Sequence, residues 1–374
     1  MPAFGRESAN MKQVPIEEID RNLRVPRSVE DPDIVWADVR DDPFTVYGLY
    51  DYRNQPEFKR LPDHIAQATN PGVAQLAHNT AGGRVRFCTD SDVIAIHAEM
   101  PTVCRFPHMP LTGSAGFDLS VDDSDSGTSR FWRPFVPPVD MENGYESAVR
   151  FPSRKLRYVT IHFPSYSDVK TLLIGLRGDA ALGQGLPYRN ALPVVFYGSS
   201  ITQGGCASRP GNSYQDVIAA RMGLNYVNLG FSGSGLAEDV IVSYMAEMPM
   251  CAFVSDYDHN APDAEHLMKT HARMYRTIRA AHPDIPYIML SRYDFDCEYV
   301  QNVRRRDVIY NTYREAWEAG DRNVYYIDGA SVFRGVYEDL CTVDGVHPND
   351  LGFALLADAI GAELRRALSQ SLFL

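Results

Sequence analysis

Five short apolar segments in the second half of the chain constrain its fold more than any other feature. They lie at 194–197, 226–229, 252–255, 287–290 and 324–327. Helical patterns alternate with them, at 213–222, 236–248, 263–281, 303–319 and from about 350 to 367. This alternation predicts an α/β fold, in which a parallel five-stranded sheet carries helices on both faces. Ligands bind such sheets beyond the carboxyl ends of the strands.

The first half of the chain has a different rhythm. Compact β patterns, separated by Gly, Pro, Asp and Ser, occur at 84–88, 93–97, 116–121, 156–162 and 170–176. Only one short helix is expected among them, around 61–76, so this half is predicted to be an all-β sandwich. We therefore expect three parts: an extension (1–29), a β-sandwich domain (30–185) and an α/β domain (190–374). A connector rich in small and turn residues, 178–187, joins the two domains.

The charge balance argues against two classes of partner. The formal net charge is −12, and an acidic surface repels phosphate backbones and anionic lipid, so neither nucleic acid nor membrane is expected. The six cysteines form no C-x-x-C pair, which favours reduced thiols over a disulfide framework or a zinc site. No apolar signal segment is visible at the amino terminus, so a cytoplasmic location is expected. The sequence leaves open whether the chain forms a homo-oligomer.

A serine-containing turn follows the first strand of the α/β half. In Gly198-Ser-Ser-Ile-Thr-Gln-Gly204, a serine at a strand-to-helix turn would point its hydroxyl out of the top of the sheet, beside free backbone N–H groups. The motif is neither a phosphate-binding P-loop nor the G-x-S-x-G elbow. A plain Gly/Ser turn is the alternative interpretation.

Three further segments are expected at the same end of the sheet. A glycine loop, 228–235, follows the second strand, and the polar segment 256–262 follows the third; each alone is as well explained as a loop or helix cap. Beyond the fifth strand, Asp344 and His347 stand three apart with a turn glycine between them. A carboxylate and an imidazole placed in this way can contact each other, the Asp orienting the His as a base for a serine.

Together, in this order, the four segments resemble those of the SGNH (GDSL-type) hydrolases. Ser200 matches the catalytic serine of that family, although Ser199 replaces the usual Asp before it. Gly233 matches the oxyanion glycine. Asn260 matches the oxyanion asparagine, without the Gly and Asp that usually flank it.

The resemblance extends to the base and to the fold. Asp344-Gly-Val-His-Pro348 is similar to the Asp-x-x-His-Pro block of these hydrolases, which makes Asp344 and His347 the other members of a triad with Ser200. The family implies a flavodoxin-like domain and a two-step acyl transfer through an acyl-enzyme. It also implies that the backbone N–H groups of Ser200 and Gly233 and the side chain of Asn260 hold the oxyanion, with no cofactor and no metal.

The first half shows a second resemblance. Ser114-Ala-Gly-Phe-Asp-Leu-Ser-Val-Asp122 is similar to the Gly-x-Asp-Leu-Tyr signature of a β domain that precedes some bacterial SGNH esterases, with Ser120 where Tyr is usual. The segments 82–87 and 90–95 also resemble that domain. This implies a jelly-roll-like sandwich beside the esterase domain, as in some carbohydrate acetyl esterases.

The substrate is less constrained than the chemistry. The β domain favours small acyl groups, above all O-acetyl groups on a saccharide, as the ester substrate. Trp132 is a candidate for stacking on a sugar, although packing is the favoured explanation for it. Tyr257 and Arg292 are candidates for lining the pocket, and loop packing explains each of them equally well. A lipase or thioesterase acting on longer acyl chains is one alternative. A non-catalytic carbohydrate-binding protein is another.

Overall fold

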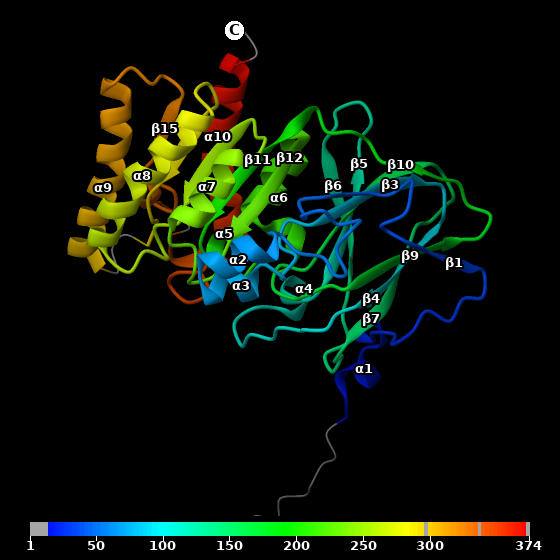
Figure 1. The fold of residues 1–374 in the computed structure, drawn as a ribbon. Helices are drawn as coiled ribbons and strands as arrows, with labels where there is room; N and C mark the ends of the chain where they lie inside the picture. Colours follow the sequence, from blue (N-terminus) through cyan, green and yellow to red (C-terminus); the bar gives the residue numbers. More distant parts are fainter. Residues whose placement is uncertain (1–13, 295–297, 336–337, 372–374) are drawn as a thin grey trace, which may run out of the picture.

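The structure is a computed structural model that describes residues 14–294, 298–335 and 338–371. A β-rich half and an α/β half lie side by side (Figure 1). Within the described residues, no helix combines the length and the apolar character needed to cross a bilayer. The five described cysteines are free thiols, and Cys297 lies outside the described residues.

The β-rich half is a sandwich of two antiparallel sheets. One sheet has the order β1-β9-β4-β7, and the other has the order β10-β3-β8-β5-β6 with β2 paired to β3. The strands are β1 (Ile34–Asp38), β2 (Thr45–Tyr47), β3 (Arg84–Thr89), β4 (Val93–Glu99), β5 (Phe117–Asp122), β6 (Ser129–Phe135), β7 (Gly144–Arg150), β8 (Arg157–His162), β9 (Thr171–Arg177) and β10 (Leu182–Gln184). Fully buried side chains such as Phe87, Ile96 and Leu119 fill the space between the sheets. The predicted sandwich is confirmed.

The α/β half contains one parallel five-stranded sheet with the order β12-β11-β13-β14-β15. Its strands are β11 (Asn190–Gly198), β12 (Leu224–Gly230), β13 (Ala252–Asp256), β14 (Tyr287–Leu290) and β15 (Val324–Ile327). In chain order this is 2-1-3-4-5, the flavodoxin-like arrangement, whose ligand site lies between the first and third strands. Here those strands are β11 and β13. The predicted α/β fold is confirmed.

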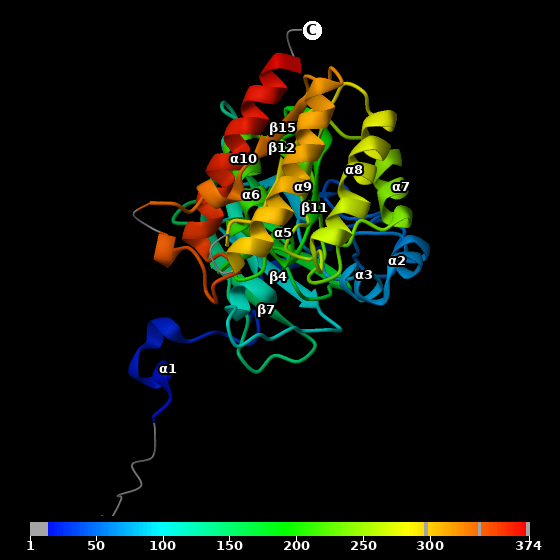
Figure 2. The ribbon, with the colours of Figure 1, turned by 90° about the vertical axis from the view of Figure 1, so that its left-hand side faces the viewer.

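Helices cover both faces of this sheet (Figure 2). They are α6 (Tyr214–Met222), α7 (Asp239–Glu247), α8 (Ala264–Ala281), α9 (Tyr299–Glu318) and α10 (Asp350–Ser371). Because side chains alternate along a strand, Val195 and Tyr197 of β11 pack with α7, α8 and α9, while Val194 and Phe196 pack with α6 and α10.

Two helices of the β-rich half belong to the core of the other half. They are α2 (Asp63–Thr69) and α3 (Pro71–Leu76), and Figure 1 shows them beside α7 rather than on the sandwich. Ala66 and Val73 join the same buried cluster as Tyr197 and Ile241. The short helix expected around 61–76 is therefore confirmed as the pair α2 and α3, and its apolar side chains pack against the helical layer of the α/β half.

Short elements complete the fold. They are α1 (Ile16–Ile19), α4 (Leu111–Ser114), α5 (Ser200–Gln203) and the 3₁₀ turns Arg21–Leu23, Pro210–Asn212, Gly329–Ser331 and Glu338–Leu340. We propose the predicted division, with an extension at 1–29, a sandwich domain at 30–185 and an α/β domain at 190–374. The helices α2 and α3 would then be an arm of the first domain on the second.

A buried charged cluster joins the two halves. Asp118 of β5, in the Gly-x-Asp-Leu segment, accepts hydrogen bonds from His162 Nδ1 (2.7 Å), Arg209 Nη1 (2.6 Å) and the backbone N–H of Gly211 (3.0 Å). The other ring nitrogen of His162 lies 3.4 Å from a carboxylate oxygen of Asp216. Arg209, Gly211 and Asp216 all come from the α/β half. Asp118 therefore anchors the chain that follows α5.

Candidate active site

The turn at the end of β11 places Ser200 at the amino end of α5. Ser199 caps this helix, because its Oγ accepts a hydrogen bond from the Ile201 N–H (3.2 Å). A side chain at Gly198 would place its Cβ 2.1 Å from Thr202 Oγ1 and 2.3 Å from the carbonyl oxygen of Asp256, so only glycine fits there. Although Ser199 departs from the family's Asp, it can fill the capping position.

A continuous hydrogen-bonded chain connects Ser200 to Asp344 through His347. Ser200 Oγ lies 2.9 Å from His347 Nε2, and His347 Nδ1 lies 2.7 Å from Asp344 Oδ2. The other carboxylate oxygen of Asp344 accepts the backbone N–H groups of Val346 (3.0 Å) and His347 (2.7 Å). The structure thus brings together the three residues of the predicted triad.

The ionisation of Asp344 sets the tautomer of His347. Burial alone would raise the pKa of Asp344, but hydrogen bonds from the backbone and ring of His347 and from the Val346 N–H lower it to about 2. The carboxylate is therefore ionised at neutral pH and only accepts hydrogen bonds, so Nδ1 of His347 carries the proton. The lone pair of Nε2 then faces the Ser200 hydroxyl, as a general base requires.

Gly233 and Asn260, the two expected oxyanion donors beside Ser200, are hydrogen-bonded to each other. The N–H of Gly233 donates to Asn260 Oδ1 (3.0 Å), and Asn260 Nδ2 donates to the carbonyl of Phe231 (2.8 Å). The amide NH₂ has two hydrogens, and its one other hydrogen bond within the described part of the chain is a long one to the carbonyl oxygen of Gly235 (3.4 Å). The N–H of Ser200 has no partner within α5, because the first residues of a helix lack an intrahelical acceptor.

A buried arginine from the β-rich half shapes the glycine loop. Arg60 donates through Nη1 to the carbonyls of Gly230 (2.5 Å) and Asn228 (3.2 Å), and its guanidinium lies 4.5 Å from the centre of the Phe231 ring. Burial lowers the pKa of Arg60 to about 9. Gln203 of α5 adds a second tie, since its Oε1 accepts the Ser232 N–H (3.0 Å). Sequence reasoning missed both residues, because no local pattern marks a long-range hydrogen bond to a carbonyl.

The β-rich half also reaches the triad directly. Tyr166 donates its hydroxyl hydrogen to the carbonyl of Ser200 (3.1 Å), and the ring of His108 lies 5.9 Å from the ring of His347. Buried Cys206 follows α5 and packs with Tyr166. Burial, followed by the charge of Asp344, raises the pKa of the Cys206 thiol to about 11, so this thiol is protonated at neutral pH and does not compete with Ser200 as a nucleophile.

The contacts of the three pocket candidates among the described residues are with residues outside the candidate triad. Tyr257 is buried, with its hydroxyl 2.9 Å from Thr270 Oγ1. Trp132 stacks on Phe151 within the sandwich, with ring centres 4.9 Å apart. The backbone N–H of Arg292 donates to Asp258 (2.9 Å). Among the described residues, no contact joins any of the three to a triad residue, and the placement of Tyr257 and Trp132 argues for packing roles.

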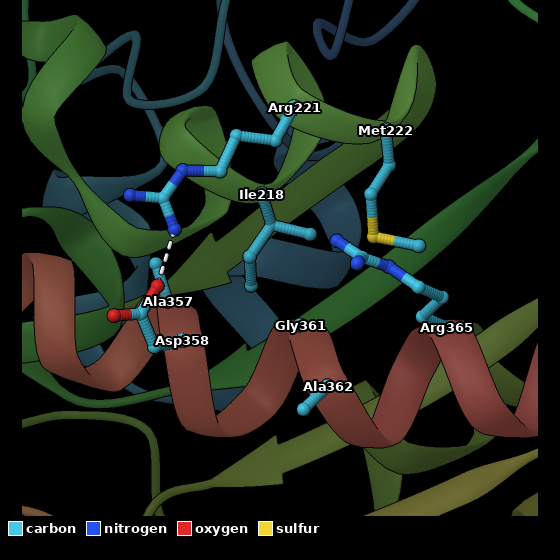
Figure 3. Close-up of a pocket in the computed structure, with 8 residues that line it drawn as sticks. All are labelled: Ile218, Arg221, Met222, Ala357, Asp358, Gly361, Ala362 and Arg365. Atoms are coloured by element: carbon cyan, nitrogen blue, oxygen red, sulfur yellow. Dashed lines mark hydrogen bonds and ion pairs between the residues drawn. The ribbon is translucent and has the colours of Figure 1, made fainter.

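A hollow of about 180 Å³ lies elsewhere, between α6 and α10 (Figure 3). It is lined by Ile218, Arg221, Met222, Ala357, Asp358, Gly361, Ala362 and Arg365. An ion pair between Arg221 and Asp358 (2.5 Å) closes one side of it. Met222 ends α6 just before β12 begins, so the hollow lies toward the amino ends of the strands. The triad lies at their carboxyl ends.

Comparisons with known families and structures agree with this architecture. Residues 191–365 match the model of the GDSL-like lipase/acylhydrolase family, and residues 34–182 match that of the amino terminus of SGNH hydrolase-type esterases. Among curated proteins, no significantly similar sequence was found.

Solved structures share the whole two-part fold. A Bacteroides ovatus protein described as a GDSL-like lipase is 26% identical, with a TM-score of 0.80, over 90% of this chain and 98% of that one. The salicylyl-acyltransferase SsfX3 of a tetracycline biosynthetic pathway is 21% identical, with a TM-score of 0.71, over 90% and 98%. The acetyl xylan esterase Est2A of Butyrivibrio proteoclasticus is 12% identical, with a TM-score of 0.57, over 90% and 99%. The last two likenesses concern the fold alone.

Proposed function

We propose that Ser200, His347 and Asp344 form the catalytic triad of this chain. Through its residues 191–365 the chain belongs to the GDSL-like lipase/acylhydrolase family, and it is a carboxylic ester hydrolase. The observation that carries the proposal is the unbroken hydrogen-bonded path from the Ser200 hydroxyl to the Asp344 carboxylate. The same arrangement argues against a protein that only binds carbohydrate, since binding requires no such path.

The triad would act in two steps. Ser200 Oγ attacks the ester carbonyl carbon while His347 Nε2 takes the hydroxyl proton, and the tetrahedral intermediate then expels the alcohol, which receives that proton. The product is an acyl ester on Ser200. A water molecule next attacks this ester, giving its proton to His347, and collapse releases the acid and returns the proton to Ser200. Throughout, Asp344 stays ionised and stabilises the imidazolium.

The oxyanion would be held at the amino end of α5. The Ser200 N–H is free of an intrahelical partner, and the second amide hydrogen of Asn260 has only a weak contact. The Gly233 N–H, which is expected to be the third donor, is bonded to Asn260 Oδ1 in the resting structure. We therefore assign the Gly233 N–H to orienting the Asn260 amide. It would donate to the oxyanion only if its hydrogen bond to Asn260 Oδ1 is broken when substrate binds.

Replacing Asn260 tests this assignment. Asn260→Ala should lower kcat by about 10²- to 10³-fold with a smaller effect on KM, because the donor acts on charge that develops in the transition state. Asn260→Asp keeps an acceptor for the Gly233 N–H but removes the donor, so it should lose as much activity. The measurement is steady-state hydrolysis of p-nitrophenyl acetate, with circular dichroism to check the fold. Full activity in Asn260→Asp would remove Asn260 from the oxyanion site.

The substrate class that we propose is small acyl esters, above all O-acetyl groups on saccharides. The amino-terminal β domain supports this class, because its residues 34–182 match the model of the amino terminus of SGNH hydrolase-type esterases. The fold likeness to an acetyl xylan esterase is consistent with a saccharide as the alcohol part.

Chain-length dependence is the experiment that tests the substrate class. Wild-type protein and Ser200→Ala are assayed on p-nitrophenyl esters from acetate to palmitate, and on acetylated xylo-oligosaccharides with release of acetate measured. We expect the highest kcat/KM on acetate or propionate and turnover of the acetylated saccharide. Highest activity on esters with long acyl chains would favour a lipase or thioesterase. Absence of turnover of every ester would favour a binding protein.

A further inference from the structure

A cluster of metal-binding side chains lies beside the triad and has no part in the proposed reaction. His108 of the β-rich half, Cys206 after α5, and His347 each offer one ligand atom, and these atoms all lie within 4.8 Å of one another. Ligand atoms in a tetrahedral zinc site are about 3.3–3.7 Å apart, as follows from bond lengths of about 2.0–2.3 Å. At its widest, the cluster is therefore about 1 Å wider than a closed zinc site, and small movements of its side chains would remove that difference; His108 is exposed.

The two remaining ligands are held in place. Cys206 has a φ of +75°, a left-handed conformation that residues other than glycine seldom adopt, and it packs with Met109 and Tyr166. His347 is held through Nδ1 by Asp344, at 2.7 Å. A histidine that ligates a metal commonly donates its other ring nitrogen to a carboxylate in this way.

We propose that His108, Cys206 and His347 form a zinc site, and that its occupation switches the esterase off. Thiolate and imidazole ligands favour Zn²⁺ over Mg²⁺ or Ca²⁺, which prefer oxygen. Binding forms one Zn–S and two Zn–N bonds, and the thiol proton of Cys206 is released to solvent. A fourth position stays open to water.

The inhibition follows from the lone pair that the metal uses. Nδ1 of His347 is bonded to Asp344, so the metal must bind Nε2, the atom that accepts the Ser200 proton. The lone pair of Nε2 can bind either the metal or the proton of Ser200, but not both at once. Zinc and catalysis therefore exclude each other, and the β-rich half, through His108, takes part in the inhibited state.

The first test is inhibition in a buffered zinc series. Hydrolysis of p-nitrophenyl acetate is measured after chelator treatment and then against free Zn²⁺, with each variant normalised to its own metal-free rate. Wild type should be inhibited and should recover on chelation. His108→Ala and Cys206→Ala should each raise the zinc concentration for half-inhibition by at least about tenfold, since even outer-shell losses cost 10- to 100-fold in metal affinity. His64→Ala, an exposed histidine of α2, and Cys251→Ala are the matched controls and should behave like wild type.

The second test does not depend on ester hydrolysis. Co²⁺ added to the metal-free chain should give a thiolate-to-cobalt charge-transfer band in the wild type and in Ser200→Ala, and no such band in Cys206→Ala. Binding in Ser200→Ala separates the zinc site from the proposed reaction. Equal zinc inhibition in wild type, His108→Ala and Cys206→Ala, or absence of the band in the wild type, would overturn the proposal.

Discussion

Ser200→Ala should lower kcat for p-nitrophenyl acetate by about 10⁵- to 10⁶-fold, the size of loss seen when a serine hydrolase loses its nucleophile. The reason is that the acyl-enzyme can no longer form, so only direct attack by water remains. His347→Ala should cost about as much, because the hydroxyl without a base is a weak nucleophile. Asp344→Asn should cost about 10⁴-fold, since an amide no longer fixes the tautomer of His347.

The double variant Ser200→Ala/His347→Ala tests whether the two residues act as one catalytic unit. Residues that act as one unit are strongly non-additive, so the double variant should be no slower than either single variant. Two residues acting independently would give multiplied losses. Burst kinetics would add a second measurement, because wild type should release one equivalent of p-nitrophenol ahead of the steady state. If Ser200→Ala kept the wild-type rate, the nucleophile would lie elsewhere.

Asp118→Ala should destabilise the folded chain by roughly 3–5 kcal/mol, the range for removing one member of a buried ion pair. Its carboxylate accepts from His162, Arg209 and Gly211, and its removal leaves the buried His162 without that partner and frees the chain after α5. The measurement is urea unfolding followed by far-ultraviolet circular dichroism. Asp123→Asn, an exposed acid of the next turn, is the matched control and should change little.

The same cluster makes stability depend on pH. Burial alone would lower the pKa of His162, but the charges of Asp118 and Asp216 outweigh it and raise that pKa. A raised pKa means that this contribution is complete below the unfolded value of about 6.5 and is lost as pH rises through the folded value. Burial alone would raise the pKa of Asp118, but the charge of His162, its hydrogen bond and Arg209 outweigh burial and lower that pKa. The contribution of Asp118 to stability is therefore lost only as pH falls through this lowered pKa.

Stability should therefore fall between about pH 6.5 and the raised pKa of His162, and this fall should be smaller in His162→Gln. The free energy of unfolding in urea at a series of pH values from 6 to 9 gives the comparison. An equally steep alkaline fall in His162→Gln would assign the pH dependence to another group. No loss of stability in Asp118→Ala would show that the cluster does not hold the halves together.

In the β-sandwich, the central strands could be predicted from the sequence and the edge strands could not. The β patterns of β3, β4, β5, β8 and β9 were clear because each of these strands has partners on both sides and is largely buried. Five sandwich strands were not predicted: β1, β6, β7 and β10, which are the ends of their sheets, and β2, which pairs with β3 alone. An edge strand tolerates polar residues and proline, such as Pro134 in β6, so its apolar alternation is weak.

The parallel sheet of the α/β half followed from the sequence for the same reason. Its strands are buried on both faces and read as short apolar runs, and the predicted ranges 287–290 and 324–327 coincide with β14 and β15. The chemistry-bearing residues were also visible locally, because Ser200, Asp344 and His347 stand in compact turns at strand ends. Their hydrogen-bonded order needed the structure.

What only the tertiary structure decided is how the two halves meet at the triad. The sequence by itself determined a β-sandwich and a doubly wound sheet and indicated three candidate triad residues, since strand burial and turn chemistry are local properties. It contained no sign that Arg60 binds the carbonyls of the glycine loop, that Gly233 bonds to Asn260, or that His108 lies beside His347. Such contacts join positions far apart in the chain, and only packing of one half on the other brings those side chains within reach.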